Sequence, residues 1–368
     1  MNILILNSIL YTPDGEGNIP RVQTIKDTMI YGMCLGFLHL GHNVTLAALE
    51  DYKPIGKEYY EFSVLFFKSD YKNVFKTSVL PYSSEMKQYL KRHHKDFDII
   101  ISSEVFQFQS LYAARICPQK TMIWQELTTH QNKFHKLPSK FWYNVVARFF
   151  MRNVRYVVPR SRKAAEFIRR YMSNVSDTII DHGIDIDKFK YSVKKKRQLI
   201  SSSQLIYRKN VDGIIRKFAK FHKMKGYEDI RLIIAGRGEE EGKLKKLTTK
   251  LELQGYVDFV GFLPQTELNE YIRNSYAFLV NTRKDLNMVS IPESIVSGTP
   301  ILTNLEPASA DYIAANSLGI AKDYWDEADM KTMIDSNKQF VSNCIAYRNN
   351  LTNKYSAELF IDVFNNGK

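Results

Sequence analysis

Residues 276–303 read YAFLVNTRKDLNMVSIPESIVSGTPILT and contain one complete unit of the fold. An apolar run at 276–280 is followed by a polar loop, an apolar pattern of helical period near 290–298, and a second apolar run at 300–303. A strand, a helix and a second strand in this order are typical of two parallel strands joined by a helical crossover. This stretch therefore predicts a parallel sheet.

The same alternation runs along most of the chain. In the first half we expect strands near 2–7, 44–49, 62–67, 97–102, 120–124, 155–158 and 178–181, and helices near 20–40, 85–94, 105–115, 137–152 and 161–172. In the second half we expect strands near 198–202, 230–235, 257–260, 276–280 and 300–303, and helices near 210–224, 240–253, 265–273 and 290–298. The pattern predicts an α/β protein with two Rossmann-like, doubly wound domains that face each other across a cleft.

A basic segment, Lys194–Arg197, separates the two halves and is the best candidate for a linker. We therefore expect an N-terminal domain over residues 1–190 and a C-terminal domain over residues 191–350. The chain reads as helical after about residue 327, and the last part, 351–368, is expected to be a helix.

The composition excludes several classes of protein. The chain has 368 residues, 44% of them hydrophobic and 25% charged, which is typical of globular domains and not of disordered or low-complexity chains. Its three cysteines lie far apart, which argues against a disulfide framework or a cysteine zinc site. We expect a cytoplasmic protein, because no apolar run reaches the length of a membrane span and residues 1–7 read as a buried strand.

The positive charge is concentrated in one region. The net charge is +13, yet residues 133–170 alone hold eleven Lys or Arg against one acid, Glu166. Within this region, residues 141–150 form an apolar helical stripe with basic residues beside it. Either the stripe packs in the core behind a solvated basic edge, or it docks on an anionic membrane surface at the inner face of the membrane. Nucleic acid is not expected as a partner, because the aromatic residues do not alternate with the charges.

Three loops carry residues suited to binding a phosphorylated ligand. Gly15 and Gly17 follow the first strand and precede a helix, where backbone amides can approach a phosphate. The basic pair Arg208-Lys209 follows a strand that ends in small polar residues. Asp285 and Glu293 are two carboxylates placed on either side of a loop that leads into a helix.

At these motifs the sequence resembles glycosyltransferase family 4, whose members are retaining nucleotide-sugar enzymes with the GT-B fold. The family's carboxylate, seven residues and Glu correspond to Asp285-x7-Glu293, and its strand entry corresponds to Ser297-Gly-Thr-Pro300. Segments 180–189, 205–210, 232–238 and 257–262 follow in the family's order. The resemblance is strong from about residue 178 to 305 and weak before residue 120.

The chain departs from the family at three places. Asp285 stands where the family usually has Glu, and Gln204 stands where it has a diphosphate-binding Arg. Gln125-Glu126 stands where the family has a His-Asp pair near the reacting centre, and His130 is off register. These changes leave open an alternative, a non-catalytic subunit of the same fold that supports a partner transferase. A sugar-nucleotide epimerase or a phosphorylase of the same architecture is a weaker possibility.

The resemblance implies transfer of a sugar from a nucleoside diphosphate sugar, with UDP or GDP as the nucleotide, to a glycan or lipid-linked acceptor in cell-surface polysaccharide synthesis. It also implies no metal and no cofactor, and a C-terminal helix that returns to the N-terminal domain. The implied catalytic residues are Asp285, which would hold a donor-sugar hydroxyl, and Gln125 and Glu126. The implied donor-binding residues are Gly15, Gly17, Arg208, Lys209, Gly236, Arg237, Gly261, Phe262, Asn287, Met288, Val289 and Glu293.

Overall fold

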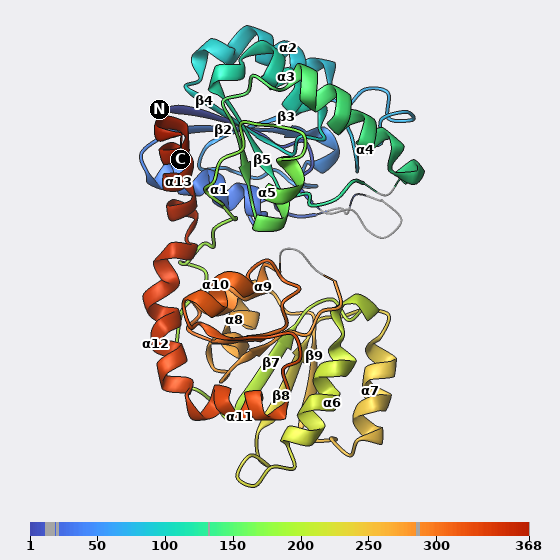
Figure 1. Ribbon diagram of the computed structural model, residues 1–368, viewed down its shortest axis with the longest axis vertical. Coiled ribbons are helices and arrows are strands. Elements are labelled where there is room, and N and C mark those ends of the chain that lie inside the picture. The colour runs from blue at the N-terminus through green and yellow to red at the C-terminus, as the bar shows by residue number, and fades with distance from the viewer. Residues whose placement is uncertain (12–18, 20–21, 132, 285–287, 368) are drawn as a thin grey trace. The chain divides into compact units, whose positions relative to one another are not determined.

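The computed structural model describes residues 1–11, 19, 22–131, 133–284 and 288–367, and it divides into two compact units (Figure 1). Unit 1 contains residues 1–183 and 352–368, and unit 2 contains residues 184–351. The first division between the units thus falls a few residues before the expected boundary at 190.

Unit 1 is built on a six-stranded parallel sheet in the order β3-β2-β1-β4-β5-β6. Its strands are β1 (Asn2–Leu6), β2 (Asn43–Leu49), β3 (Ser63–Phe67), β4 (Ile99–Ser103), β5 (Thr121–Gln125) and β6 (Tyr156–Pro159). The central strands are buried on both faces, which explains why they read as continuous apolar runs. The order of the strands reverses between β1 and β4, so the connections from these two neighbours leave in opposite directions.

Helices cover both faces of this sheet. They are α1 (Met29–His39), α2 (Ser84–His93), α3 (Phe108–Ile116), α4 (Leu137–Phe141), the π-helix η5 (Trp142–Phe150) and α5 (Arg162–Ile168). Figure 1 shows α2 and α3 on one face and α1 and α5 on the other. Short 3-10 turns complete the unit at η1 (Glu50–Tyr52), η2 (His94–Asp96), η3 (Pro118–Lys120) and η4 (Lys133–Lys136).

Two expected elements of unit 1 differ in the structure. The first helix begins at Met29 and not near residue 20, because the Glu58 carboxylate binds Thr24 and the Ile25 amide, and Thr28 caps the helix. The described residues 178–181 form no strand, so that prediction is wrong. Ile180 instead donates its amide to the Pro159 carbonyl and accepts a hydrogen bond from the Trp124 indole.

Unit 2 repeats the architecture with the sheet order β12-β11-β10-β7-β8-β9, again parallel. Its strands are β7 (Gln198–Ser202), β8 (Arg231–Ala235), β9 (Val257–Gly261), β10 (Phe278–Leu279), β11 (Ile301–Thr303) and β12 (Gly319–Ala321). The edge strand β12 was not expected from the sequence, because it has three residues and begins with glycine. The order reverses between β7 and β10.

The helices of unit 2 divide between the two faces of its sheet. One apolar cluster contains residues of α6 (Val211–Phe221), α7 (Glu241–Lys250) and α11 (Glu327–Asp335), and a second contains residues of α8 (Gln265–Arg273), α9 (Ser290–Val296), α10 (Ala310–Ala315) and α12 (Asn337–Tyr347). Two 3-10 turns, η6 (Tyr207–Lys209) and η7 (Arg348–Leu351), lie in the connections. Within the described residues, every helix of the protein is too short or too polar to cross a membrane.

The last helix, α13 (Asn353–Asn366), belongs to unit 1, as the family resemblance implied. It packs against α1, and both helices lie on the same side of the sheet in Figure 1. The contact is close because Gly36 of α1 has no side chain: a Cβ there would lie 2.2 Å from the Asn353 carbonyl oxygen. Further along, the rings of Phe37 and Phe360 pack with their centroids 6.1 Å apart.

We therefore expect Gly36→Ala to loosen the α1–α13 contact. The added methyl group must displace backbone, which costs about 1–3 kcal/mol of stability. Hydrogen exchange followed by mass spectrometry should show faster exchange of the α1 and α13 amides. The matched control is Gly242→Ala in α7, where nothing lies within 4 Å of the new Cβ. Unchanged exchange of both helices in Gly36→Ala would show that the contact is not close-packed.

Candidate active site

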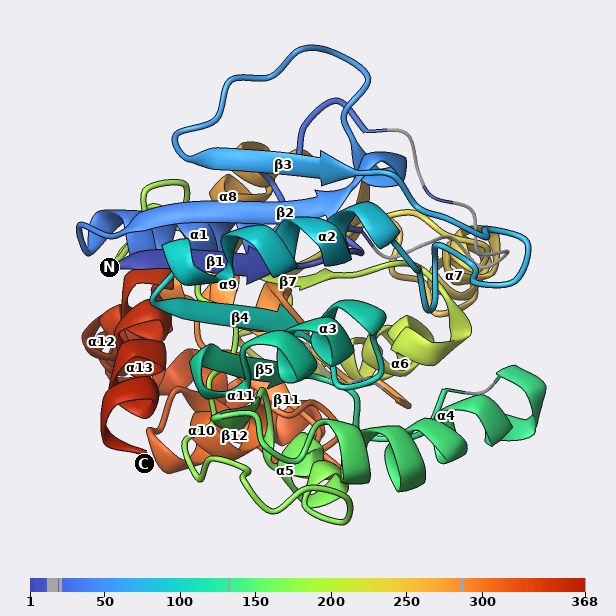
Figure 2. The ribbon, with the colours of Figure 1, turned by 90° about the horizontal axis from the view of Figure 1, so that it is seen from above.

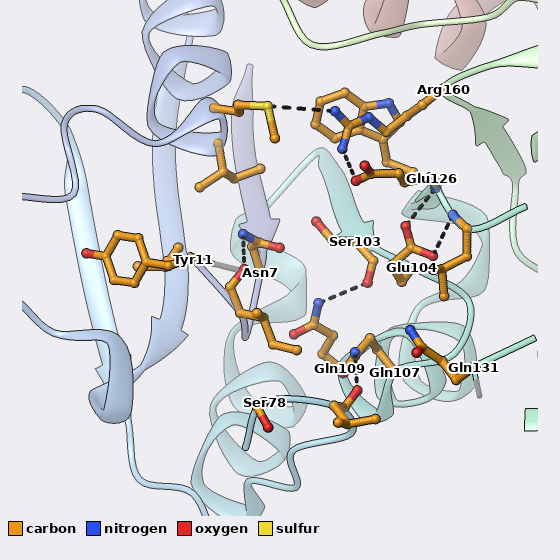
Figure 3. Close-up of a pocket in the computed structure, with 17 residues that line it drawn as sticks. Asn7, Tyr11, Ser78, Ser103, Glu104, Gln107, Gln109, Glu126, Gln131 and Arg160 are labelled. Atoms are coloured by element: carbon orange, nitrogen blue, oxygen red, sulfur yellow. Dashed lines mark hydrogen bonds and ion pairs between the residues drawn. The ribbon is translucent and has the colours of Figure 1, made fainter. Parts of the chain in front are cut away.

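A cavity of about 380 Å³ opens in unit 1 where the order of the strands reverses. Asn7 follows the end of β1, Ser103 ends β4 and Glu104 follows it, and Glu126 follows β5 (Figure 3). Ligands bind at the carboxyl ends of strands at such a reversal, because the connections on either side leave a crevice there. A cavity of this size is within the range of small-molecule sites.

Glu104 is the most unusual residue of this cavity. Its backbone is left-handed, with φ of 65°, which a glutamate rarely adopts. Its two carboxylate oxygens accept hydrogen bonds from the amides of Glu126 (2.6 Å) and Leu127 (3.3 Å). Burial in the cavity wall, reinforced by the neighbouring Glu126 carboxylate, raises the pKa of Glu104 to about 8. At neutral pH this side chain therefore mostly holds a proton.

Arg160 supplies the positive charge of the cavity wall. Its guanidinium lies 2.5 Å from the Glu126 carboxylate and 3.5 Å from Asp181, and it stacks over the Trp124 ring at 4.6 Å (Figure 3). The His182 Nδ1 atom lies 2.6 Å from Arg160 Nη2, so Nδ1 accepts that hydrogen bond. Arg160 is buried, and two carboxylates compensate its charge, as a buried cation requires.

Gln125 and Glu126 were expected together at the reacting centre, and the structure separates them. Gln125 is 0% exposed, and its side chain accepts from the Val105 amide and donates to the Leu127 carbonyl and the Tyr143 hydroxyl. Gln125 thus serves the core in this structure, and only Glu126 of the pair lines the cavity. Alternation along a strand explains the difference, because consecutive side chains point in opposite directions.

Sequence reasoning missed Glu104, Arg160 and the amide side chains of the cavity wall, which are Asn7, Gln107, Gln109 and Gln131. No short motif marks them, since they come from four separate segments, at residues 7, 104–109, 131 and 160. One signal was available: Asn7 ends the expected strand 2–7, and Glu104 lies two residues after the expected strand 97–102. The carboxyl ends of such strands are where a doubly wound sheet places its ligand-binding residues.

The reversal point of unit 2 brings the basic pair and the loop after β10 together. The Arg208 carbonyl accepts hydrogen bonds from the Thr282 hydroxyl (3.0 Å) and the Arg283 amide (2.8 Å), and the Arg208 guanidinium donates to the Lys284 carbonyl (3.1 Å). Lys209 ends the 3-10 turn η6 directly beside this contact. The structure thus holds the expected donor-binding residue Arg208 against residues 282–284, which directly precede the expected segment 285–289.

The two other strand ends of unit 2 also meet. The Gly236 amide donates to the Gly261 carbonyl at 2.7 Å, and Arg237 Nε lies 3.8 Å from the position that a Cβ on Gly261 would take. Gly236 has φ of 130°, and a Cβ there would lie 1.9 Å from the Ser203 carbonyl oxygen, so only glycine fits. Phe262 is 70% exposed, which leaves its ring available for stacking.

Glu293 lies in the first turn of α9 and is buried, with the Gln265 amide 3.3 Å from its carboxylate. Met288 is buried, and Val289 directly precedes the helix. The remaining expected residues, Asp285, Asn287, Gly15 and Gly17, lie outside the described residues. Among the described residues, no three His, Cys, Asp or Glu side chains come together as metal ligands would.

The basic segment of unit 1 presents a second apolar face to solvent. Trp142, Tyr143 and Ala147 are buried in the core, as one interpretation of the stripe expected. Leu137, Phe141, Phe149 and Phe150 are exposed, between the exposed side chains of Lys140, Arg148 and Arg152. The π-helical backbone explains this split, because its longer turn rotates Phe149 and Phe150 away from the buried face. Figures 1 and 2 show the segment at the outer edge of unit 1.

We expect the raised pKa of Glu104 to appear in the stability of the protein. An unfolded glutamate has a pKa near 4.3, so between about pH 4 and 8 the folded state holds a proton that the unfolded state has lost. The free energy of unfolding should therefore fall as pH rises through this range, by up to about 1.4 kcal/mol per pH unit.

Glu104→Gln should remove this contribution. Denaturant unfolding of both proteins between pH 4.5 and 8.5 measures the difference in slope. Glu166→Gln, which changes an exposed carboxylate on α5, is the control. Its free energy of unfolding should change with pH in the same way as that of the parent. If parent and Glu104→Gln lose stability in parallel over this range, the folded protein holds no extra proton at Glu104.

The chain resembles curated proteins that are named for the synthesis of a glucosyldiacylglycerol. It is 25% identical over 201 residues to alpha-monoglucosyldiacylglycerol synthase of Streptococcus pneumoniae, a match that covers 50% of this chain and 45% of that protein. It is 20% identical over 219 residues to alpha-monoglucosyldiacylglycerol synthase of Acholeplasma laidlawii, which covers 52% of this chain and 54% of that protein. The matched stretches thus span about half the length of these relatives.

Solved structures share the whole fold at low sequence identity. HepE of Anabaena, crystallised in complex with UDP, aligns with a TM-score of 0.64 and 13% identity over 98% of both chains. The lipopolysaccharide outer core galactosyltransferase WaaB aligns with a TM-score of 0.65 and 14% identity over 98% of both chains. At this level of identity the likeness concerns the fold.

Two family models match adjacent parts of the chain. The model described as Glycosyltransferase Family 4 matches residues 27–188, and the model described as Glycosyl transferases group 1 matches residues 184–348. Together the two matches cover residues 27–348, one over each of the two doubly wound units that the structure contains. The chain therefore belongs to the family 4 type of glycosyltransferases and has the GT-B fold.

Proposed function

We propose that this protein is a retaining glycosyltransferase that moves a sugar from a nucleoside diphosphate sugar to a lipid-linked or glycan acceptor. The observation that carries the proposal is the contact between Arg208, which Lys209 follows in the chain, and the loop at 282–284, at the reversal point of a family 4 sheet. The two cations near this reversal point support the proposal, because a doubly wound sheet is expected to bind a nucleotide there. That HepE was crystallised with UDP supports a nucleoside diphosphate as the ligand.

The donor would bind to unit 2. Lys209 and Arg208 would neutralise the diphosphate, and Glu293, held near Gln265, would accept hydrogen bonds from the ribose. The nucleobase would stack at Phe262 beside Arg237. Asp285 would hold a hydroxyl of the donor sugar. No metal is needed in this proposal, because fixed cations and amides can stabilise the charge that develops on the leaving diphosphate.

In the chemical step, the bond between the anomeric carbon and the diphosphate oxygen breaks, and the acceptor oxygen forms a bond to the same face of that carbon. The electron pair leaves with the diphosphate, which is why the cations of unit 2 matter. Attack on the same face keeps the acceptor hydroxyl next to the leaving oxygen, so the acceptor proton can pass to the diphosphate. Glu126, held by Arg160, would orient the acceptor in unit 1.

The acceptor is proposed to be carried by a membrane. The two relatives are named for the synthesis of a glucosyldiacylglycerol, which is a lipid. The exposed residues Phe141, Phe149 and Phe150 between Lys140, Arg148 and Arg152 suit the interface of an anionic bilayer, since aromatic side chains enter the headgroup region and basic ones attract its charge. A role in cell-surface glycan synthesis would follow from such an acceptor.

The donor assignment predicts that Lys209→Ala weakens the binding of UDP or GDP at least roughly tenfold, the value of one charge-assisted hydrogen bond of about 1.5 kcal/mol. Isothermal titration calorimetry in the presence of EDTA measures this and tests the independence from metal. Lys250→Ala at the end of α7 is the control, because it removes the same charge from an exposed site of unit 2. Equal affinity of Lys209→Ala and the parent would refute the assignment.

A non-catalytic subunit remains the alternative, because the side chain at the family's histidine position, Gln125, is used entirely by the core. The two functions differ in turnover. A transferase should release nucleoside diphosphate from a matching donor sugar, by slow hydrolysis or by transfer. If the protein binds the nucleotide tightly but produces no nucleoside diphosphate from any donor sugar, the alternative is favoured.

The membrane assignment predicts co-sedimentation with vesicles that contain phosphatidylglycerol, less so as salt rises, because charge attraction is screened over about 8 Å at physiological salt. Changing Lys140, Arg148 and Arg152 to Gln should abolish most of this binding. The control changes Lys225, Lys246 and Lys250 of unit 2 to Gln, the same loss of charge at exposed positions elsewhere. If both triple variants pellet like the parent, unit 1 does not dock through this segment.

A further inference from the structure

We propose that the cavity of unit 1 accepts an uncharged sugar and discriminates against one that carries a phosphate or a carboxylate. This names the class of acceptor headgroup and rests on the proposed function. The proposal distinguishes a neutral glycolipid or neutral glycan acceptor from an acidic one, and family membership alone does not make this distinction.

The charges of the cavity wall disfavour an anionic ligand. Besides the neutral phenol of Tyr11, the ionisable lining residues among those described are two acids, Glu104 and Glu126, and one strong base, Arg160. The two terminal nitrogens of Arg160 are already engaged, because they contact Glu126, Asp181 and His182, and the guanidinium lies over the Trp124 ring. Its Nε has no hydrogen-bond partner among the described residues, and this N–H can donate to a sugar hydroxyl oxygen. An anionic ligand would therefore meet a wall that is neutral or negative, and it would have to compete with Glu126 for the one cation.

A buried hydrogen-bond acceptor in the cavity wall favours a ligand that donates a hydrogen bond. Gln107 is buried, and its Nε2 donates to the Val79 carbonyl at 3.0 Å. Its Oε1 finds no hydrogen-bond partner among the described residues. A buried acceptor in this state favours a ligand that donates a hydrogen bond, as a sugar hydroxyl does and a phosphate or carboxylate oxygen does not.

The rest of the wall fits a polyhydroxylated ring. Gln131, Ser103 and Glu104 all line the cavity, and Figure 3 shows Glu104 between the other two. Gln109 is fixed by hydrogen bonds to the Leu6 and Ser103 carbonyls. Amide and hydroxyl groups can each donate and accept, which matches sugar hydroxyls, and the apolar residues among the lining can cover a face of the ring.

The cavity also differs from the surface beside it. The segment 137–152 outside the cavity is basic, whereas the lining contains no lysine among the described residues. Attraction to an anionic surface and selection of the headgroup would thus be performed by separate groups. A chain adapted to an anionic headgroup would be expected to carry its cations into the cavity, and this one does not.

Binding of small glycosides to the full chain tests the proposal without relying on turnover. The probes are the methyl α-glycosides of glucose, galactose and mannose, each paired with its methyl uronide, which differs by one carboxylate. Saturation-transfer NMR titrations give the dissociation constants. We expect the best neutral glycoside to bind at least tenfold more tightly than its uronide at pH 7. Gln107→Met, which keeps the size but removes the acceptor, should weaken it about fivefold or more.

A charge variant makes the test specific for the cavity. Gln131→Lys should raise the affinity for the uronide and narrow the preference to less than about threefold, because it adds a cation to the wall. Gln119→Lys, an exposed change in η3 outside the cavity, should leave the preference as it is. Narrowing by both variants alike would contradict the assignment to the cavity.

Titration with UDP in parallel distinguishes the two proposals. If UDP binds and a uronide binds as tightly as its neutral partner, or no neutral glycoside binds, the inference on the acceptor is overturned and the proposed function stands. If neutral glycosides are preferred with the expected response of the variants, but no nucleoside diphosphate binds, the selectivity of the cavity is supported and the transferase proposal fails.

Discussion

Both units depend on one constraint, the reversal of strand order between two adjacent parallel strands. At β1 and β4 in unit 1, and at β7 and β10 in unit 2, the connections leave neighbouring strands toward opposite faces. The strand ends are therefore left uncovered at one point of each sheet. In unit 1 that point holds the cavity with Glu104 and Glu126, and in unit 2 it holds the basic pair Arg208-Lys209. The strand order of each sheet therefore decides where its candidate binding site lies.

The two reversal points carry different charged groups, and this difference suits a donor in unit 2 and an acceptor in unit 1. Unit 2 places its cations on connections between strands, where a diphosphate could be neutralised. Unit 1 holds its one cation inside the protein, balanced by Glu126 and Asp181, and keeps Glu104 mostly protonated at neutral pH. The left-handed backbone of Glu104 and its bonds to two amides fix the loop that carries Glu126. Strain of this kind persists where the surroundings enforce it, and it is common at functional sites.

Much of the fold could be predicted, because buried parallel strands leave an apolar run that can be recognised locally, as at 276–303. The failures have local causes too. Residues 178–181 are apolar enough for a strand but bond to Pro159 and Trp124, and the π-helix changed which aromatic residues of 141–150 are buried. The unit 2 site could be anticipated from motifs. Glu104 and Arg160 could not, since their roles arise from contacts between segments distant in sequence.

The most direct test is a crystal structure of the full chain with UDP and a neutral methyl glycoside bound together. We expect the diphosphate within hydrogen-bond distance of Lys209, and the sugar in the cavity of unit 1 with one hydroxyl on Gln107 Oε1 and another on Glu126. Density for the nucleotide in the cavity of unit 1, or for the glycoside at a site that touches neither Gln107 nor Glu126, would contradict it.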